Sequence, residues 1–372
     1  MRTSTTDRRA LPPAARQAVG RRITAPVRVL FALLVAVSIT GVSIPTWLQY
    51  VPLVVSLVVF GLPHGALDHL VPARLAGQRP TWWSIITVVA LYVLLGGATL
   101  VLWAVAPMMA FAFFILLTWF HWGQGDLWAM LALDGATHLT TRRAREAALL
   151  IRGALPMIVP LLTQGDTYRL VAAGATTVLS PTPATPLPHP TPGTAVTGAV
   201  VAGAALLLYA WSTHRTARRD PAALRDWRTD MLDTILLTVF FATVPAILAI
   251  GLYFCAWHAI RHIIRLAAID PANRADVEAG RLLHPILRFG RDALPITAIA
   301  LVLLAALAAS SPSPADAPEH LLGVYLVLLS ALTVPHVVIV TLMDARQGVW
   351  RTVTTSAATT DGGTADRQAH RP

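Results

Sequence analysis

Long apolar runs recur through this chain from residue 27 to residue 342, and no extended polar domain interrupts them. A helix needs about 20 apolar residues to cross the hydrocarbon core of a bilayer. Charged residues make up 13% of the sequence, whereas soluble domains carry about 25%. The sequence therefore predicts an all-α, polytopic integral membrane protein whose helices form a bundle within the lipid bilayer.

Ten apolar segments are candidate membrane spans. They cover residues 27–44, 47–62, 83–104, 108–130, 145–164, 194–211, 230–243, 245–266, 292–309 and 319–342. The seventh and eighth segments run together, and one helix from Met231 to Ile264 would be about 51 Å long, too long for a hydrocarbon core of about 30 Å. We expect Pro245 to break this helix and reverse the chain. One kinked span, giving nine in total, is the competing interpretation.

The placement of arginine favours ten spans. The chain contains no lysine, so its formal net charge of +10 comes from arginine. With ten spans, arginine-rich connections alternate with connections that contain no arginine or, in residues 165–193, only Arg169. The positive-inside rule then predicts a multi-pass cell-membrane protein with both termini in the cytoplasm. We expect a disordered basic segment at residues 1–26, a membrane domain at 27–345 and a disordered tail at 346–372.

The composition also excludes some classes of function and processing. The arginines lie between apolar spans, where they contact anionic headgroups, so they do not indicate nucleic-acid binding. No small-residue cleavage site follows the first 26 residues, so a cleaved signal peptide is not expected. Cys255 is the only cysteine and lies in an apolar span, which excludes an intramolecular disulfide. The Pro- and Thr-rich residues 176–194 predict an extended outer loop, in which His189 is incidental.

Four polar clusters interrupt the apolar spans, and each contains histidine. They are GLPHGALDH (61–69) with His64, Asp68 and His69, TWFHWGQGD (118–126) with His121, GLYFCAWHAIRHIIRL (251–266) with His258 and His262, and LTVPHVVIVTLMD (332–344) with His336. His258 and His262 are four residues apart, so on a helix both imidazoles could face one metal ion. Ionisable groups at membrane depth are costly and usually functional. Hydrogen-bonded structural histidines are the alternative for each cluster taken alone.

In the ten-span topology, all four clusters fall in the inner half of the bundle. This shared depth predicts one metal site in the cytoplasmic half. Imidazole ligands suit iron, copper, zinc or nickel, and an apolar surrounding is compatible with oxygen chemistry on a lipid-soluble substrate. Histidines in loops, near span ends or in the tail are treated as background: His138, His189, His214, His284, His320 and His370.

At these residues the chain resembles the Brp/Blh family of membrane β-carotene 15,15′-dioxygenases. The motifs that carry the resemblance are GLPHGALDH at 61–69, FHWGQGD at 120–126, YFCAWHAIRH at 253–262 and PHVVIVTLMD at 335–344. The resemblance implies a non-haem Fe(II) enzyme that uses O₂ to cleave the central double bond of β-carotene, or of a related carotenoid, into two retinal molecules. It implies His64, His121, His258 and His262 as iron ligands. The family is associated with retinal supply to microbial rhodopsins, so a rhodopsin is the implied recipient of the product.

The resemblance also suggests roles for neighbouring residues. Asp68 would orient a ligand histidine, while His69 and His336 would lie beside the ligands or line a substrate tunnel. The residues alone leave open whether His64 or His69 is the ligand from the first motif. Aromatic residues near the clusters could contact a polyene, pack internally or face lipid: Phe114, Trp119, Trp122, Phe254 and Trp257.

Three other functions stay open at this point. A histidine-box desaturase or hydroxylase acting on another lipid would need more HxxxH-type pairs than the single one at 258–262. A proton or metal-ion transporter could use intramembrane histidines and aspartates, although it should place them at several depths, and no inverted repeat is visible. A haem-anchoring protein could use His121 and His258 as axial ligands.

Overall fold

The computed structural model describes residues 11–180, 187, 191–311 and 318–352, and within these ranges the chain is helical and forms no β-strand. The long helices are α2 (Ala25–Ile39), α3 (Thr46–Val55), α6 (Trp82–Val105), α7 (Pro107–Ala132), α8 (Arg142–Thr163), α10 (Pro192–Ala217), α11 (Pro221–Thr243), α15 (Leu283–Ser310) and α16 (Pro318–Gln347). The shorter ones are α1 (Pro13–Val19), α4 (Pro63–Ala66), α5 (Val71–Leu75), α9 (Gly165–Thr176), α12 (Ala246–Leu252), α13 (Ile260–Ala268) and α14 (Arg274–Glu278). The all-α prediction is confirmed.

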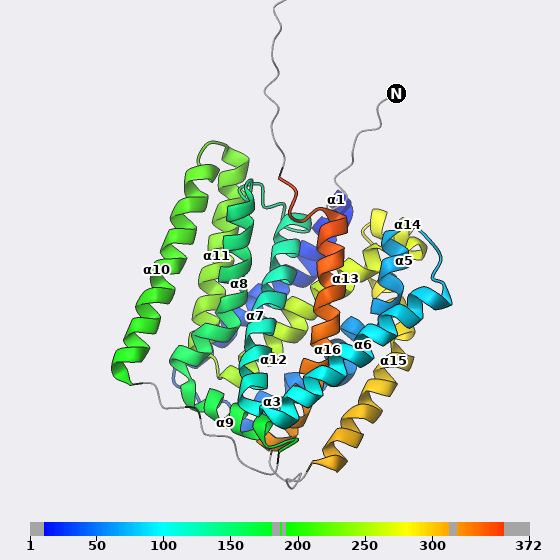
Figure 1. Cartoon of the computed structure of the whole chain (residues 1–372). Coiled ribbons are helices and arrows are strands. Elements are labelled where there is room, and N and C mark those ends of the chain that lie inside the picture. Colours follow the sequence, from blue (N-terminus) through cyan, green and yellow to red (C-terminus); the bar gives the residue numbers. More distant parts are fainter. Residues whose placement is uncertain (1–10, 181–186, 188–190, 312–317, 353–372) are drawn as a thin grey trace, which may run out of the picture.

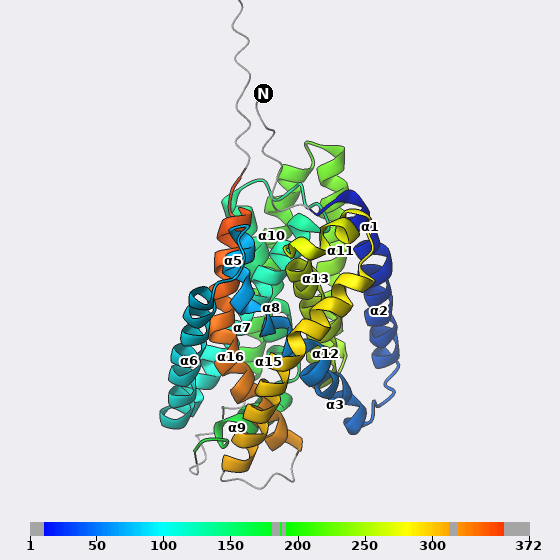
Figure 2. The ribbon, with the colours of Figure 1, turned by 90° about the vertical axis from the view of Figure 1, so that its right-hand side faces the viewer.

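The long helices form one bundle, with α10, α6 and α15 on its outside (Figures 1 and 2). These three helices expose large apolar side chains such as Leu94, Leu207 and Val302, which are 68–73% exposed. Contiguous apolar surface of this kind is unusual on a soluble monomer and is stable against lipid. Helix α1 and the C-terminal end of α16 lie at one end of the bundle, and α9 lies at the other (Figure 1).

Within the described residues, eight helical segments are long and apolar enough to cross a membrane. They support a multi-pass membrane protein. Helices α7 and α11 coincide with the fourth and seventh predicted spans but are not among the eight, and both carry buried polar side chains such as His121 and Asp233. Both helices bring polar groups into the bundle, as do α13 with His262 and α16 with His336.

The helix breaks at Pro245, as predicted, and the chain reverses there. Helix α11 ends at Thr243 and α12 begins at Ala246, and the rings of Phe241 and Tyr253 on the two sides of the break pack with centroids 5.3 Å apart. Gln164 satisfies the backbone groups that the break exposes. Its Nε2 donates to the carbonyls of Phe241 (3.2 Å) and Val244 (2.9 Å), and its Oε1 accepts from the Ala246 amide (2.8 Å). Unpaired backbone groups are costly in an apolar medium, so this side chain stabilises the turn.

Two glycines allow α7 and α8 to pack in close contact. A Cβ atom on Gly123 would lie 2.2 Å from the Leu149 carbonyl oxygen, and one on Gly153 would lie 2.0 Å from the Trp119 carbonyl oxygen. Small residues at such positions let helix backbones approach closely in membranes. This contact holds α7, which carries His121, against the centre of the bundle.

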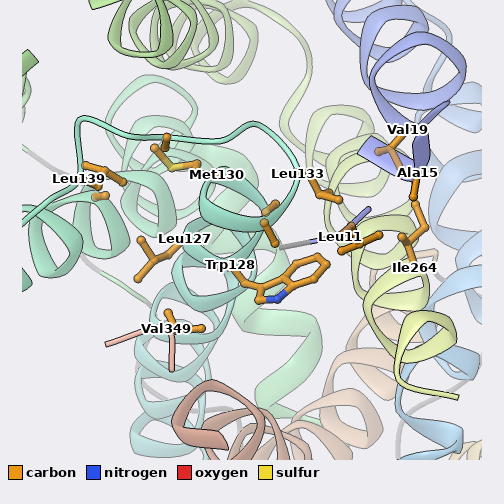
Figure 3. Close-up of a cluster of buried hydrophobic side chains, with 14 of the residues drawn as sticks. Leu11, Ala15, Val19, Leu127, Trp128, Met130, Leu133, Leu139, Ile264 and Val349 are labelled. Carbon is orange, nitrogen blue, oxygen red and sulfur yellow. The ribbon is translucent and has the colours of Figure 1, made fainter. Parts of the chain in front are cut away.

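The predicted disorder of residues 1–26 is wrong for the part that the structure describes. Residues 13–24 are helical and continue into α2. Leu11, Ala15 and Val19 are buried against Leu133 and Ile264, as Figure 3 shows. Burying Leu11 and Val19 contributes about 1.5–3 kcal/mol each, which is enough to order a short helix. Val349 joins the same cluster from beyond α16. The rest of the predicted tail, from residue 353, lies outside the described residues.

Two further boundaries differ from the prediction. Helix α9 occupies residues 165–176, which were expected to belong to an outer connection, because its buried face packs on α16. Helix α15 begins at Leu283, nine residues before the predicted span. Part of the predicted outer loop, residues 181–186 and 188–190, lies outside the described residues.

Replacing Gly153 with alanine should destabilise the protein. The added methyl group collides with the α7 backbone, and overpacking of this kind costs about 1–3 kcal/mol. Gly203→Ala on α10 is the matched control, because nothing lies within 4 Å of its Cβ position; alanine there should be neutral or stabilise by up to about 1 kcal/mol. Thermal unfolding in detergent measures both, and equal effects would contradict the close contact.

Candidate metal centre

The first histidine comes from an irregular, buried stretch between α3 and α5. The chain leaves α3 through a π-helical turn, η2 (Ser56–Gly61), and His64 lies in the short helix α4 that follows. A π-turn changes the helical hydrogen-bond pattern and is frequent at functional sites. Here the Gly61 carbonyl accepts a hydrogen bond from His64 Nδ1. This contact orients the ring and leaves its Nε2 for another partner.

His258 and His262 lie on either side of the junction between a second π-helical turn and α13. The turn is η4 (Tyr253–Ala259), and it packs against η2. Both rings lie near His64, with centroids 6.1 Å and 5.8 Å from it. Their closest imidazole neighbours differ, however: His258 packs on His121 at 4.8 Å, and His262 packs on His336 at 5.0 Å.

Helices α7 and α16 contribute the remaining two imidazoles. The His336 ring lies at the centre of the cluster, with centroids 4.8 Å from His64 and 4.9 Å from His121. All five rings are at most 6% exposed. The four sequence motifs, whose histidines lie up to 272 positions apart (His64 and His336), therefore meet in one buried group of histidines.

The donor atoms fit a transition-metal ion. The histidines and Asp68 form two sets, each with its ligand atoms within 4.8 Å of one another: His64, His121 and His258, and Asp68, His262 and His336. Nε2 of His258 lies 3.2 Å from Nε2 of His121, close to the spacing of about 3 Å between two nitrogens that each lie about 2.1 Å from one ion. Nε2 of His262 and of His336 are buried with no hydrogen-bond partner. Such orphaned nitrogens are costly, and a divalent first-row metal would satisfy them.

Asp68 lies beside the cluster and contacts one of its histidines directly. Its Oδ2 accepts hydrogen bonds from His336 Nδ1 at 2.7 Å and from the Tyr92 hydroxyl at 2.6 Å. A carboxylate bonded to one ring nitrogen fixes the tautomer and directs the other nitrogen toward a metal. This arrangement suits the orienting role expected of Asp68, and it points Nε2 of His336 toward the other rings.

The structure does not bring His69 into the cluster. It lies in a 3₁₀ turn, η3 (Asp68–Leu70), is half-buried, and its Nδ1 donates to the Ala66 carbonyl at 3.1 Å. The helix breaks at Leu67, where φ is −98° and ψ is 11°; beyond the break Asp68 bonds to His336, whereas His69 bonds to the nearby Ala66 carbonyl. The background histidines within the described residues have other neighbours; His138, for example, donates to Asp230 at 3.1 Å. His189 and His370 lie outside the described residues.

An apolar cavity extends from the histidine cluster to helix α9. It occupies about 960 Å³, including the part that opens to the outside, and His64 and His121 lie at the end opposite α9. Its walls are mostly apolar, and phenylalanine, isoleucine, leucine and valine side chains of α7, α9, α12 and α16 contribute many of the lining residues. Of the five aromatic residues considered from the sequence, Phe114, Trp122 and Phe254 line the cavity, while Trp119 and Trp257 donate hydrogen bonds elsewhere. A metal in the cluster would face a space suited to a long hydrocarbon.

Comparison with known proteins agrees with this description of the site. The sequence model of the family described as beta-carotene 15,15′-dioxygenase matches residues 55–344. The chain belongs to this family.

Members of the family among curated proteins match nearly the whole chain. The probable beta-carotene 15,15′-dioxygenase Blh of Halobacterium salinarum is 40% identical over 346 residues, which is 90% of this chain and 96% of the relative. The protein named probable beta-carotene 15,15′-dioxygenase Brp, from the same species, is 27% identical over 322 residues, covering 83% and 88%. No solved structure matches the chain.

Sequence reasoning missed a set of buried charges that lies beside the family motifs. Asp126, at the end of FHWGQGD, accepts a hydrogen bond from Trp257 Nε1 at 2.9 Å and pairs with Arg152 at 3.2 Å and Arg261 at 3.7 Å. The Arg261 guanidinium also stacks on the Trp257 ring at 3.7 Å. Because Trp257 and Arg261 flank His258 and His262 in the chain, these contacts hold the two ligand candidates in place.

A second pair of charges connects the last motif to the same helices. Asp344 accepts from Arg265 at 2.7 Å and from Gln124 at 3.2 Å, and all three side chains are buried. The sequence signal was present, because Gln124 and Asp126 follow His121 while Arg261 and Arg265 surround His262. The sequence alone did not show which aspartate pairs with which arginine.

Removing the Asp126 carboxylate charge should destabilise the protein strongly. Asp126→Asn keeps the shape of the side chain but leaves Arg261 buried without its carboxylate, and breaking a buried ion pair costs about 3–5 kcal/mol. The matched control is Glu146→Gln, which breaks an exposed pair with Arg142 and should cost less than about 1 kcal/mol. Chemical denaturation in detergent compares the two variants; an Asp126→Asn protein as stable as the control would contradict the packing role.

Proposed function

We propose that the protein cleaves the central 15,15′ double bond of β-carotene, or of a related carotenoid, with O₂ and releases two retinal molecules. Family membership supports this reaction. The observation that carries the proposal for this chain is the apolar cavity that ends on buried histidines. In this reaction one C=C bond breaks and two C=O bonds form, and both oxygen atoms of O₂ enter the products, so no proton or outside electron is consumed.

We propose that His64, His121, His258 and His262 hold a non-haem Fe(II) ion, with the Nε2 atom of His336 directed at the same space. The buried donor atoms and their spacing support this assignment. Bound iron supplies the redox chemistry that lets the double bond react with O₂. Neutral imidazoles suit this role, because they leave the ion its positive charge. His69 is left out of the proposed set, and Asp68 orients His336 through its hydrogen bond.

The residues of the cavity select which double bond reacts. A stiff polyene lying along the walls can present only the bond that its length brings beside the histidines, so positioning determines the site of cleavage. The apolar walls also keep water away from the reacting carbons. The buried arginines and aspartates nearby are paired with each other, which is consistent with a reaction that requires no proton donor.

We also propose ten spans, with both termini and the metal centre in the cytoplasmic half. Helices at all ten predicted positions and the reversal at Pro245 support the count. The connections at the α1 end of the bundle carry most of the arginines, while the described connections at the α9 end contain only Arg169, which pairs with Asp166. Residues 27–345 would then form the catalytic unit in the cell membrane, drawing substrate from the bilayer. A rhodopsin in the same membrane is the proposed recipient of retinal.

Expression in cells that accumulate β-carotene should produce retinal. His262→Ala should lower retinal formation by more than about 100-fold and reduce bound iron. A ligand should matter more than a residue that only orients a ligand, and loss of the latter costs about 10–100-fold. His284→Ala is the control, since this exposed histidine bonds to Asp276 and belongs to none of the four motifs. Chromatography of retinoids and metal analysis of purified protein give the two readouts.

The same experiment separates the alternatives. Folded, iron-loaded wild-type protein that leaves β-carotene intact would contradict the proposed reaction and favour an oxidase acting on another lipid. Intact β-carotene together with no bound metal would favour a transporter. Retinal formation that survives His262→Ala would contradict the ligand assignment alone.

Reporter fusions test the topology. Green fluorescent protein at the C-terminus should fluoresce and alkaline phosphatase there should be inactive, because the positive-inside rule keeps that end in the cytoplasm. Alkaline phosphatase inserted between α2 and α3, after Gly41, should be active. The reverse pattern, or the same activity at both positions, would contradict the ten-span arrangement.

A further inference from the structure

Helix α9 closes the cavity at the end away from the histidines. Its residues Thr167, Tyr168 and Val171 line that end, together with Ile247 of α12 and Leu322 of α16. The Tyr168 hydroxyl donates to the Met157 carbonyl at 2.8 Å, so its polar atom is already satisfied. The floor that α9 presents to the cavity is therefore largely hydrocarbon.

The position of α9 is held by close contact with α16. A Cβ atom on Gly323 would lie 2.5 Å from the Gly174 carbonyl carbon, and one on Gly174 would lie 2.3 Å from the Glu319 carbonyl oxygen. Backbones this close leave α9 little freedom to move away from α16. The floor of the cavity is thus at a set distance from the histidines.

The distance from the floor to the histidines can be estimated along the helices that form the walls. Phe111 lines the cavity ten residues before His121 on α7, which at the helical rise corresponds to about 15 Å. Leu322 and Thr333 both line the cavity and lie eleven residues apart on α16, which corresponds to about 17 Å. The cavity is therefore about 15–17 Å deep.

This depth matches one arm of a carotenoid. An extended chain advances about 1.2 Å per bond, so about ten bonds from the central double bond to the ring, plus the ring itself, come to about 15 Å. Conjugation makes the polyene stiff, so both arms cannot turn into the same cavity. With its central bond at the histidines, the substrate would place one ring against α9.

We propose that α9 forms a subsite for one terminal hydrocarbon ring of the carotenoid, and that Val171 limits the length of the arm that the cavity accepts. This inference rests on the proposed function. In this proposal α9, which lies outside the histidine motifs, positions the substrate. The central bond, rather than a neighbouring one, then lies at the metal centre.

Val171→Trp tests the subsite by shortening the cavity. Cleavage of β-carotene at the central bond should fall at least tenfold, whereas a C30 apocarotenal that lacks one ring should still be cleaved within about threefold of wild type, because its shorter arm fits. Leu170→Trp is the matched control, since Leu170 is the neighbouring residue on α9, is 43% exposed and does not line the cavity. It should leave both substrates unaffected. Iron content, measured alongside, should be unchanged in both variants.

A second variant tests the subsite if Val171→Trp does not fold. Val171→Ala removes contacts with the ring, so it should raise the KM for β-carotene at least threefold and leave the KM for the C30 substrate unchanged. Equal effects on the two substrates, or no effect on either, would overturn the subsite while leaving the proposed function intact. Wild-type protein that cleaves neither substrate would overturn the proposed function and the subsite together.

Discussion

Polar groups buried in this bundle depend on partners within the protein or on a bound ion, because the surrounding lipid offers none. Five imidazoles, several aspartates and several arginines lie in the interior with almost no exposure. An unpaired polar group in such a place costs several kcal/mol. The arrangement of the helices around the centre follows largely from this cost: the carboxylates face arginines or a histidine, and the imidazoles face each other.

The irregular backbone near the centre serves the same requirement. The π-helical turns η2 and η4 pack against each other and direct His64 and His258 toward the shared space. At Pro245 the chain exposes backbone groups in the interior, and Gln164 bonds to them. At Pro245, a neighbouring side chain thus compensates for the hydrogen bonds that the break removes.

Around this polar centre the protein is organised by apolar packing of two kinds. Glycines bring α7 against α8, and α9 against α16, at backbone contact. Larger side chains leave an apolar cavity between the same helices, with the histidines at one end and α9 at the other. Close packing beside an open cavity gives a rigid site that a stiff hydrocarbon can enter. In the proposed function, this combination links the histidine cluster to the choice of the bond that is cleaved.

The sequence by itself determined the membrane class, the approximate helix positions, the break at Pro245 and the histidine motifs. These features are local: apolar length sets a span, proline removes a hydrogen bond, and a histidine in an apolar run stands out at once. The spacing of His258 and His262 also predicted that both would face the centre, although it could not show that His121 and His336 are their nearest partners.

Only the tertiary structure decided which distant groups meet. His64 was separated from His69 by a helix break at Leu67, which no spacing rule anticipates. The partnership of Asp68 with His336, and of Asp126 with Arg261, joins residues more than a hundred positions apart. Helix α1 and α9 are stable because their buried faces pack on other helices, and their own sequences are short and only partly apolar. Contacts of this kind depend on how helices pack, so the sequence supplied the chemical groups and the fold supplied their partners.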